Sequence, residues 1–312
     1  MNQIFSKQVR LMGNQFEISV VNNYEKVAME WIEQGINHIR EIEYLLTTYS
    51  NSSDLYRINE SAGIKPVIVQ KETLEIIDRS LQISALTQGA FDISYGSVDK
   101  RLWNFDIHQN ELPDPETAKK MVRLINYRNI IIDKMESTVF LKEKGMRIGL
   151  GGIGKGYAAE KTRNYLKTLG ATAGIVNASG DLTTWGKQPN GKPWTIGIAN
   201  PNHAASAFSF IEVSDMAVAT SGNYEKFIMV DGKKYSHTIN PKTGLPIHGI
   251  KSVTIITTNA ELADALTTPI AIMGIEAGLF LINQLNGVEA IIIDDDDRVY
   301  LSNHIELTNP VT

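Results

Sequence analysis

The sequence of 312 residues contains no cysteine. This absence excludes disulfide bonds, thiolate metal ligands, cysteine nucleophiles and lipid-modified cysteines. The sequence has no run of 18 apolar residues either, so we expect no integral membrane segment. Lys and Arg number 30 against 35 Asp and Glu, for a net charge of −5, and no basic block occurs. Nucleic acid is therefore not an expected partner, because binding driven by counterion release needs a concentrated positive surface.

The first residues, 1–10, show neither the apolar segment nor the cleavage site of a secretory signal. For the chain as it stands we predict a cytoplasmic protein. An extracytoplasmic location is the alternative, if a signal has been trimmed from the sequence.

Apolar periodicity divides the chain into many short strands and several helices. Helical spacing predicts helices over 24–46, 72–86, 157–169 and 261–273, and alternation predicts a strand over 8–21 around Gly13. Because strands and helices do not alternate strictly, the order favours an α+β fold over a doubly wound sheet. No linker, repeat or low-complexity segment interrupts the chain. We therefore predict a single elaborated mixed-sheet domain over residues 1–312.

The most distinctive stretch is a glycine loop, residues 146–160, in which five glycines fall within eight positions around Lys155. Glycine is favoured where the backbone needs positive φ or a very close approach. A weak strand over 139–142 and 146–148 is predicted to enter the loop, and a helix is predicted to leave it. A glycine loop before a helix directs backbone N–H groups at an anion.

Two nucleotide-binding motifs match this loop incompletely. Gly149, Gly151 and Gly154 fit G-x-G-x-x-G, but the acidic residue that should follow about 20 positions later is missing. Gly149, Gly154 and Lys155 fit G-x-x-x-x-G-K, but Gly156 replaces the Ser or Thr that binds Mg²⁺. A tight turn with close helix packing is the alternative without a ligand. The lysine among the glycines favours contact with a phosphate or nucleotide.

Two further segments suggest catalysis. Asp264 and Thr268 are four apart on a predicted helix and share a face, and their oxygen atoms suit a hard cation such as Mg²⁺. An acid in a first helical turn and a threonine bonded to its own helix are the alternative roles. His237 lies beside a turn shaped by Pro and Gly and could act as a general base or be structural.

Other polar segments are candidates for ligand contact. Asn177 and Asp181 lie at the end of a predicted buried strand, 174–177, a usual place for ligand contacts. Ser221, in the run 220–224, could contribute to a pocket of hydroxyl and N–H groups or belong to a plain turn. The acidic run 294–297 lacks the spacing of a calcium loop and is interpreted as a solvated hairpin tip.

Taken in order, these segments resemble one family, ApbE, the FAD:protein FMN transferases. The matching stretches are Gly89-Ala-Phe-Asp92, Leu150-Gly-Gly-Ile-Gly-Lys-Gly-Tyr-Ala158, Val176-Asn-Ala-Ser-Gly-Asp181, Gly191-Lys-Pro-Trp194, Thr220-Ser-Gly-Asn-Tyr224, Ser236-His-Thr-Ile-Asn-Pro-Lys-Thr-Gly244 and Ala263-Asp-Ala-Leu-Thr-Thr268. The resemblance implies that FAD is bound with Mg²⁺ and that its FMN half passes to a threonine hydroxyl of an acceptor protein. A phosphoester forms and AMP is released. The implied acceptors are redox-pump subunits or proteins of the flavin-reductase type.

The resemblance also assigns site residues. It implies a metal site made by Asp264, Thr268 and the backbone carbonyl of Gly152, and it makes His237 the base that activates the threonine. The residues implied in the flavin site are Met12, Tyr49, Ala90, Phe91, Asp92, Lys155 and Thr238. One position departs from the family pattern: Gly149 stands where an Asp usually precedes Leu-Gly-Gly.

Three other functions use the same features. A Mg²⁺-dependent hydrolase could split FAD into FMN and AMP, because it needs the same metal and phosphate contacts with water as the nucleophile. A flavin-binding protein without turnover and an NAD-type oxidoreductase are the remaining alternatives. We expect FAD to bind better than NAD, since the loop lacks the acid that holds a ribose.

Overall fold

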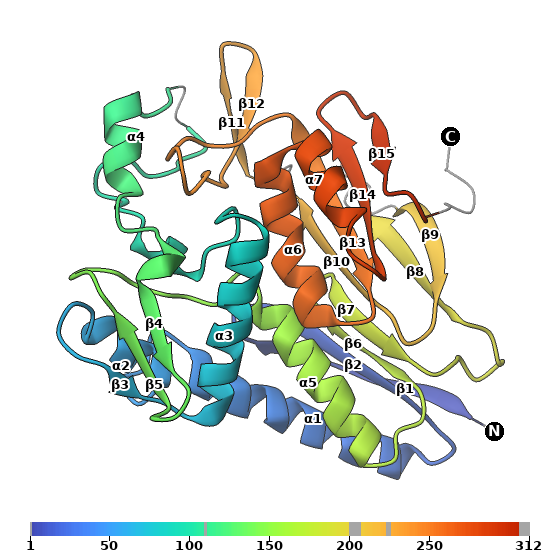
Figure 1. Cartoon of the computed structure of the whole chain (residues 1–312). Coiled ribbons are helices and arrows are strands. Elements are labelled where there is room, and N and C mark those ends of the chain that lie inside the picture. Colours follow the sequence, from blue (N-terminus) through green and yellow to red (C-terminus); the bar gives the residue numbers. More distant parts are fainter. Residues whose placement is uncertain (1, 109–110, 200–206, 223–225, 306–312) are drawn as a thin grey trace.

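The computed structural model describes residues 2–108, 111–199, 207–222 and 226–305. A sheet of eight strands crosses the molecule (Figure 1), and each pairing between its neighbours is antiparallel. The predicted α+β fold is confirmed, and the large sheet proves to be antiparallel. Its order is β1 (Gln3–Leu11), β2 (Asn14–Asn22), β6 (Gly174–Ala178), β7 (Asp181–Trp185), β10 (Ala217–Gly222), β13 (Ile250–Thr257), β14 (Val288–Asp294) and β15 (Val299–Leu301).

Helices cover one face of this sheet. They are α1 (Glu25–Leu46), α5 (Gly154–Thr168), α6 (Ala260–Met273) and α7 (Ile275–Ile282). Helix α1 is amphipathic, and its buried stripe, which includes Ile32, Ile36 and Ile39, packs on β1 and β2. Helix α5 contacts both α1 and α6, so these three helices lie side by side over the strands (Figure 1).

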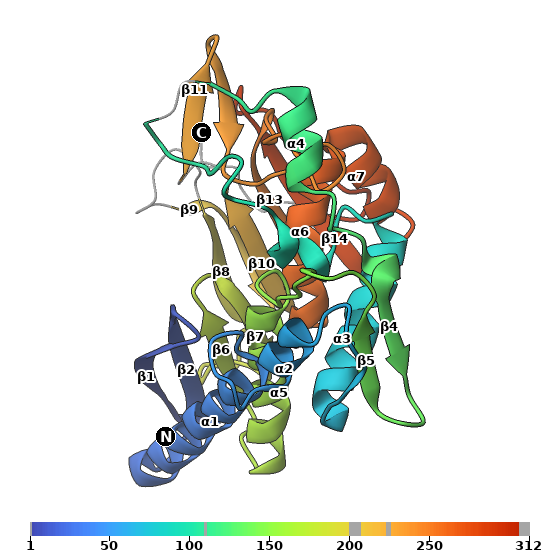
Figure 2. The same ribbon diagram turned by 90° about the vertical axis from the view of Figure 1, so that its left-hand side faces the viewer.

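The other face is covered by a hairpin of β8 (Trp194–Ala199) and β9 (Ala207–Val213), as Figure 2 shows. A second hydrophobic cluster fills this side, with Trp194 and Ile196 packed near Leu182, Val218 and Ile256 of the sheet. Both faces of the central strands are thus buried, which explains why β13 is buried along its whole length.

A smaller unit stands beside α6 and follows α1 in the chain. It consists of α2 (Asp54–Glu60), β3 (Val67–Ile68), α3 (Lys71–Leu86), the 3₁₀ turn η1 (Ile93–Ser97), α4 (Pro115–Met121), the 3₁₀ turn η2 (Tyr127–Asn129), β4 (Ile130–Asp133) and β5 (Thr138–Leu141). One hydrophobic core runs from Ile36 through Ile77 and Val139 to Ala290. Because this core is continuous, we propose that residues 1–312 form one domain.

The hairpin of β11 (Phe227–Val230) and β12 (Lys233–Ser236) projects at the top of Figure 1 and carries the chain toward His237. None of the helices in the described ranges is long and apolar enough to cross a membrane. This finding does not test the predicted cytoplasmic location, which stays a prediction.

Two expected strands differ from the structure. The stretch 8–21 is not one strand but the end of β1 and nearly all of β2, because Met12 and Gly13 adopt left-handed φ values of 50° and 74° and reverse the chain. Residues 146–148 belong to no strand. The side chain of Asn59 accepts from Ile148 N–H at 2.7 Å and donates to its carbonyl at 3.0 Å, which replaces the ladder bonds.

Candidate functional site

Helix α5 begins within the glycine loop, at Gly154, so Lys155 lies in the first turn of the helix rather than before it. Two candidate flavin residues pack at this loop. A Cβ built on Gly154 would lie 3.5 Å from Met12 Cε, and one on Gly152 would lie 3.6 Å from Phe91 Cε2. The structure therefore brings Met12 and Phe91, from distant parts of the chain, to the loop that carries Lys155.

Gly156 allows α5 to touch α6. A Cβ at this position would lie only 2.1 Å from the carbonyl oxygen of Ala260 and 2.6 Å from Asp264 Cβ. The N–H of Gly156 donates to Asp264 Oδ2 at 2.9 Å. The glycine that spoils the P-loop motif is thus needed here for helix packing, and it fixes the carboxylate of Asp264 against the start of α5.

Lys155 lies between two buried carboxylates. Its Nζ is 2.5 Å from Asp181 Oδ2 and 3.3 Å from Asp264 Oδ1. Asp181 starts β7, and its Oδ1 also accepts from the N–H of Thr220 at 3.2 Å. Three segments far apart in the sequence, the ends of α5, β7 and α6, therefore meet at one ammonium group.

The charges of this cluster do not cancel. Burial and then the negative charge of Asp264 raise the pKa of Asp181 to about 6, against the opposing effect of Lys155. For Lys155, burial would lower the pKa, but the charges of Asp264 and Asp181 outweigh it and raise the pKa. Two buried carboxylates share one ammonium, so the cluster favours one more positive charge.

A hard cation fits the donors present. Among the described residues no group of three His, Cys, Asp or Glu side chains gathers to hold a metal. Asp264 and Thr268, together with a backbone carbonyl such as that of Gly152, would offer only oxygen atoms, the ligands that Mg²⁺ prefers. Asp264 is buried and Thr268, one turn along α6, is partly exposed, so the pair reaches from the protein interior to the surface. Remaining positions around Mg²⁺ are normally filled by water and substrate phosphates.

A residue that the sequence did not reveal sets the start of α6. Glu160 is buried, its Oε2 accepts from the N–H of Ala260 at 3.0 Å, and its Oε1 pairs with Arg163. Asn259 caps the same helix by accepting from Leu262 N–H at 2.9 Å. These contacts hold α6 in register with α5, and hence Asp264 beside Lys155. No local pattern marked Glu160, because its face of α5 also carries Arg163 and its partner Ala260 lies 100 positions away.

Some candidates are placed near the loop but use their side chains elsewhere. Asp92 follows Phe91, and both of its carboxylate oxygens bond to protein groups: the N–H and hydroxyl of Ser94 and the N–H of Tyr127. Burial raises the pKa of Asp92, against these hydrogen bonds. Ala90 is buried between Gly89 and Phe91. The side chain of Asp92 thus anchors the segment that presents Phe91.

Other candidates lie apart from the lysine. Asn177 Oδ1 accepts from Gly180 N–H at 2.8 Å and so closes the turn before Asp181. Ser221 lies in β10 next to Thr220 and is partly exposed, while Tyr49 is 94% exposed in the loop after α1. Residues 223 and 224 of the run that contains Ser221 lie outside the described residues. Within the described ranges, no hydrogen bond or ion pair joins these three side chains to Lys155, whose partners are Asp181 and Asp264.

His237 lies in the segment after β12 and is exposed. Its ring makes a T-shaped contact with the ring of Phe105, with centroids 6.2 Å apart. The backbone N–H of His237 donates to the carbonyl of Lys226 at 3.1 Å. Thr238 follows, with its carbonyl accepting from Ile247 N–H at 2.9 Å. An exposed imidazole on an anchored segment is accessible to a group from another molecule.

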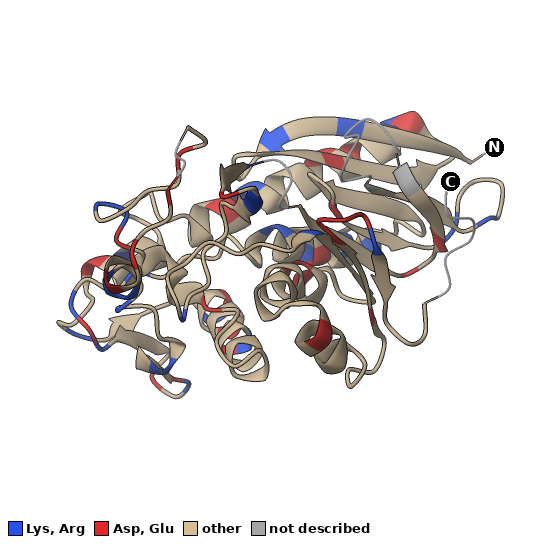
Figure 3. Ribbon diagram, turned by 90° about the horizontal axis from the view of Figure 1, so that it is seen from above, with Lys and Arg blue, Asp and Glu red and all other residues tan. Residues whose placement is uncertain are grey.

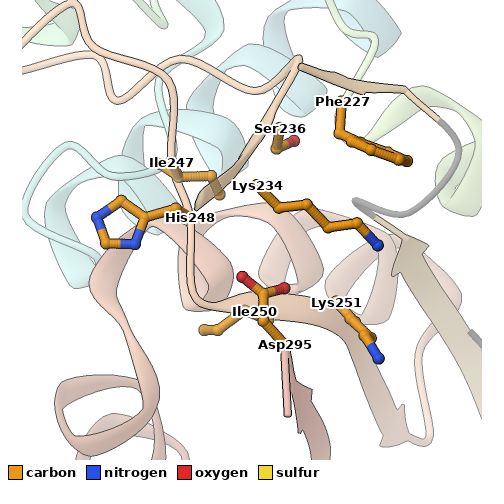
Figure 4. Close-up of a pocket in the computed structure, with 8 residues that line it drawn as sticks. All are labelled: Phe227, Lys234, Ser236, Ile247, His248, Ile250, Lys251 and Asp295. Carbon is orange, nitrogen blue, oxygen red and sulfur yellow. The ribbon is translucent and has the colours of Figure 1, made fainter. Parts of the chain in front are cut away.

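The pocket beside β12 is too small to be the flavin site. Figure 4 shows Phe227 on one side of it and Asp295 on the other, with the Lys234 side chain extending between them. Lys234 Nζ lies 4.4 Å from the centre of the Phe227 ring, and the pocket has a volume of only about 10 Å³. Ligand pockets typically measure about 300–1,000 Å³.

Gly149 has room for a side chain. No atom lies within 4 Å of a Cβ built there, and its N–H donates to the carbonyl of Ile93 at 2.9 Å. The absence of the usual Asp is therefore not imposed by packing.

Known proteins resemble this chain over nearly its whole length. A model of the ApbE family matches residues 12–292. A FAD:protein FMN transferase from Klebsiella pneumoniae is 29% identical, over 96% of this chain and 92% of its own length. Another from Treponema pallidum is 30% identical, over 87% and 79%. The crystal structure of the ApbE protein from Thermotoga maritima matches with a TM-score of 0.85 at 28% identity, over 96% and 97%.

Proposed function

The chain belongs to the ApbE family, and we propose that it uses FAD and Mg²⁺ to attach FMN to a threonine hydroxyl of an acceptor protein. It is a flavin transferase, FAD is its substrate, and its acceptor is a protein, as in the relatives named FAD:protein FMN transferase. In the proposed reaction the threonine oxygen forms a bond to the phosphorus of the FMN half. The bond from that phosphorus to the bridging oxygen breaks, and AMP leaves with that oxygen.

Lys155 is proposed to bind the phosphates of FAD. Its ammonium stands at the start of α5, where the glycine loop brings backbone N–H groups and the positive end of the helix to the same place. Asp181 and Asp264 hold the ammonium in position. A fixed positive charge at this point would stabilise the charge that develops on the phosphate oxygens during transfer.

Mg²⁺ is proposed to lie against Asp264, Thr268 and the carbonyl of Gly152. When bound there, it would neutralise phosphate charge and balance the excess of buried carboxylate around Lys155. The protein residues would hold the ion, and Gly156 would keep Asp264 oriented through its N–H.

The flavin is proposed to lie against Met12, Tyr49 and the segment of Ala90, Phe91 and Asp92. Support comes from the packing of Met12 and Phe91 on the glycine loop. Tyr49 exposes an aromatic face in the loop after α1, suited to stacking on a planar ring. Asn177, Ser221 and Thr238 remain proposed contacts of the nucleotide.

His237 is proposed to take the proton from the acceptor threonine. It is exposed, so an acceptor can reach it, and the backbone around it is anchored at both sides. A general base typically contributes about 10²–10⁴ in rate. For the acceptor we propose a redox-pump subunit or a protein of the flavin-reductase type.

The observation that supports this function most strongly is the ammonium of Lys155 held between Asp181 and Asp264 beside the glycine loop. The test is mass spectrometry of a candidate acceptor after incubation with FAD, Mg²⁺ and the protein. FMN attached to threonine, with AMP released, is the expected result. Free FMN and AMP without a modified acceptor would favour the hydrolase, and unchanged FAD would favour a binding protein without turnover.

A further inference from the structure

A groove with a volume of about 370 Å³ lies beside α4, on the smaller unit. This size is within the range of ligand sites, about 300–1,000 Å³. Its walls come from the residues that follow α3, from α4 and the residues after it, and from the segment that follows His237. Lys155 and Asp264 are not among the residues that line it, so the groove is separate from the candidate phosphate site, although Asp92 of the proposed flavin segment contributes to its lining.

The groove is lined by four exposed cationic side chains: Lys119, Arg123, Arg128 and Lys242. The acidic residue in its lining is Asp92, which is buried and whose two oxygens already accept three hydrogen bonds. Two acids, Asp114 and Glu116, lie at the start of α4, at the opposite end of the helix from Lys119. At the left of Figure 3 basic and acidic segments are interspersed, so the excess of positive charge belongs to the lining of the groove itself.

Neighbouring acids do not neutralise this lining. The pKa of Asp99 is lowered first by its two-point contact with Arg101, at 2.8 and 2.7 Å, and only last by the charge of Arg123, so this carboxylate is already paired. The guanidinium of Arg128 lies 4.9 Å from the centre of the Tyr127 ring. One face of this ring is thus already covered, which makes it a poor platform for a nucleotide base.

The segment that follows His237 packs directly against α4, which lines the groove. Ile239 packs in a small core with Met121 and Val122, next to α4, and its N–H donates to the hydroxyl of Tyr95 at 3.1 Å. Gly244 lies so close to α4 that a Cβ there would be 2.0 Å from the carbonyl oxygen of Ala118. A partner held in the groove would therefore have a fixed position relative to His237.

We propose that this basic groove docks an acidic segment of the acceptor protein and so brings its threonine to His237. The proposal rests on the proposed function, because it assumes a protein acceptor. Carboxylates suit the lining, since guanidinium groups bind them in two-point geometry and lysines add point charges. Complementary charge around a site raises the rate of association and selects partners.

The experiment measures binding of a short fluorescent oligoglutamate peptide by anisotropy at low ionic strength. We expect the wild-type protein to bind it, and the variant K119E/R123E/K242E to bind it at least about tenfold more weakly. The matched control K26E/K187E/K192E makes the same charge change at exposed lysines outside the groove and should bind as the wild type does. Arg128 is left unchanged because it packs on Tyr127.

FAD affinity of the same three proteins separates this proposal from the proposed function. Unchanged FAD affinity together with lost peptide binding in the groove variant supports docking of an acidic segment. Equal peptide binding by the groove and control variants overturns it, as does a loss of FAD affinity in the groove variant alone, which would make the groove part of a nucleotide site. If the peptide binds in the groove but mass spectrometry finds no flavinylated acceptor, the transferase proposal fails and the acceptor is overturned as the occupant, while the groove remains a site for acidic segments.

Discussion

The N–H of Gly156 donates to Asp264 at 2.9 Å across the contact of α5 and α6, where a side chain on Gly156 would overlap the carbonyl oxygen of Ala260. This contact places a candidate metal ligand next to the helix that carries Lys155. The two helices can approach closely only because position 156 has no Cβ.

We therefore expect Gly156→Ala to destabilise the protein by about 3 kcal/mol or more, the upper range of overpacking in a core. The methyl group would meet backbone atoms at 2.1 Å, and these cannot move without separating the helices. Urea unfolding measures the change. Gly151→Ala is the control: it lies in the same loop, is exposed and has no atom within 4 Å of its Cβ position. Equal stability of the two variants would contradict the role of this contact.

The glycine loop and the shared helix face of Asp264 and Thr268 could be predicted from the sequence, because short local patterns of residues indicate both. Glycine density indicated the loop, and a spacing of four placed Asp264 and Thr268 on one helix face. The pairing of Lys155 with Asp181 could not be predicted. It depends on the position of β7 beside α5, which is set by the strand order of the sheet and not by any local pattern. The same holds for Asn59, whose bonds to Ile148 span 89 positions and replace an expected strand. Local periodicity carries no information on such distant partners.

Thr268 and Thr267 give a direct test of the metal site. Thr267 Oγ1 donates to the carbonyl of Asp264 at 2.9 Å, so it is a structural threonine, whereas Thr268 is the proposed ligand. We expect Mg²⁺ to raise the melting temperature of wild type and of Thr267→Val, and the rise to be largely lost in Thr268→Val. Thr267→Val itself should lose about 1 kcal/mol of stability through its missing hydrogen bond. A full Mg²⁺ response in Thr268→Val would place the ion elsewhere.

The pH dependence of stability should reflect Asp181. Its pKa is raised by burial and by Asp264 to about 6 in the folded protein, above its value in the unfolded chain. Its stabilising contribution is therefore complete at pH below the unfolded value and is lost as the pH rises to about 6. In the absence of metal we expect the free energy of unfolding to fall across this interval by an amount on the order of 2 kcal/mol.

Denaturant unfolding of the metal-free protein between pH 4 and 7 measures this fall, and Asp181→Asn should reduce it. Asp215→Asn, at an exposed turn, is the control and should leave the curve unchanged. A profile that Asp181→Asn leaves as steep as before would show that another group titrates in this interval.

The last prediction separates the proposed base from the proposed phosphate ligand. His237 is exposed and contacts Phe105 rather than the lysine cluster, so His237→Ala should lower FMN transfer by about 10²–10⁴ while FAD affinity changes little. Lys155→Ala should weaken FAD binding as well as transfer, because an ammonium on the phosphates acts before and during the reaction.

Lys155→Ala also leaves Asp181 and Asp264 buried without their shared cation, which should cost about 3–5 kcal/mol of stability. The double variant K155A/D181N removes one of these charges and should recover part of that stability without recovering FAD affinity, so the two effects can be told apart. FAD affinity comes from fluorescence titration and the transfer rate from single-turnover labelling of the acceptor. Equal losses of FAD affinity in the His237 and Lys155 variants, or transfer that is indifferent to His237, would mean that the histidine is structural and that the threonine is activated by another group.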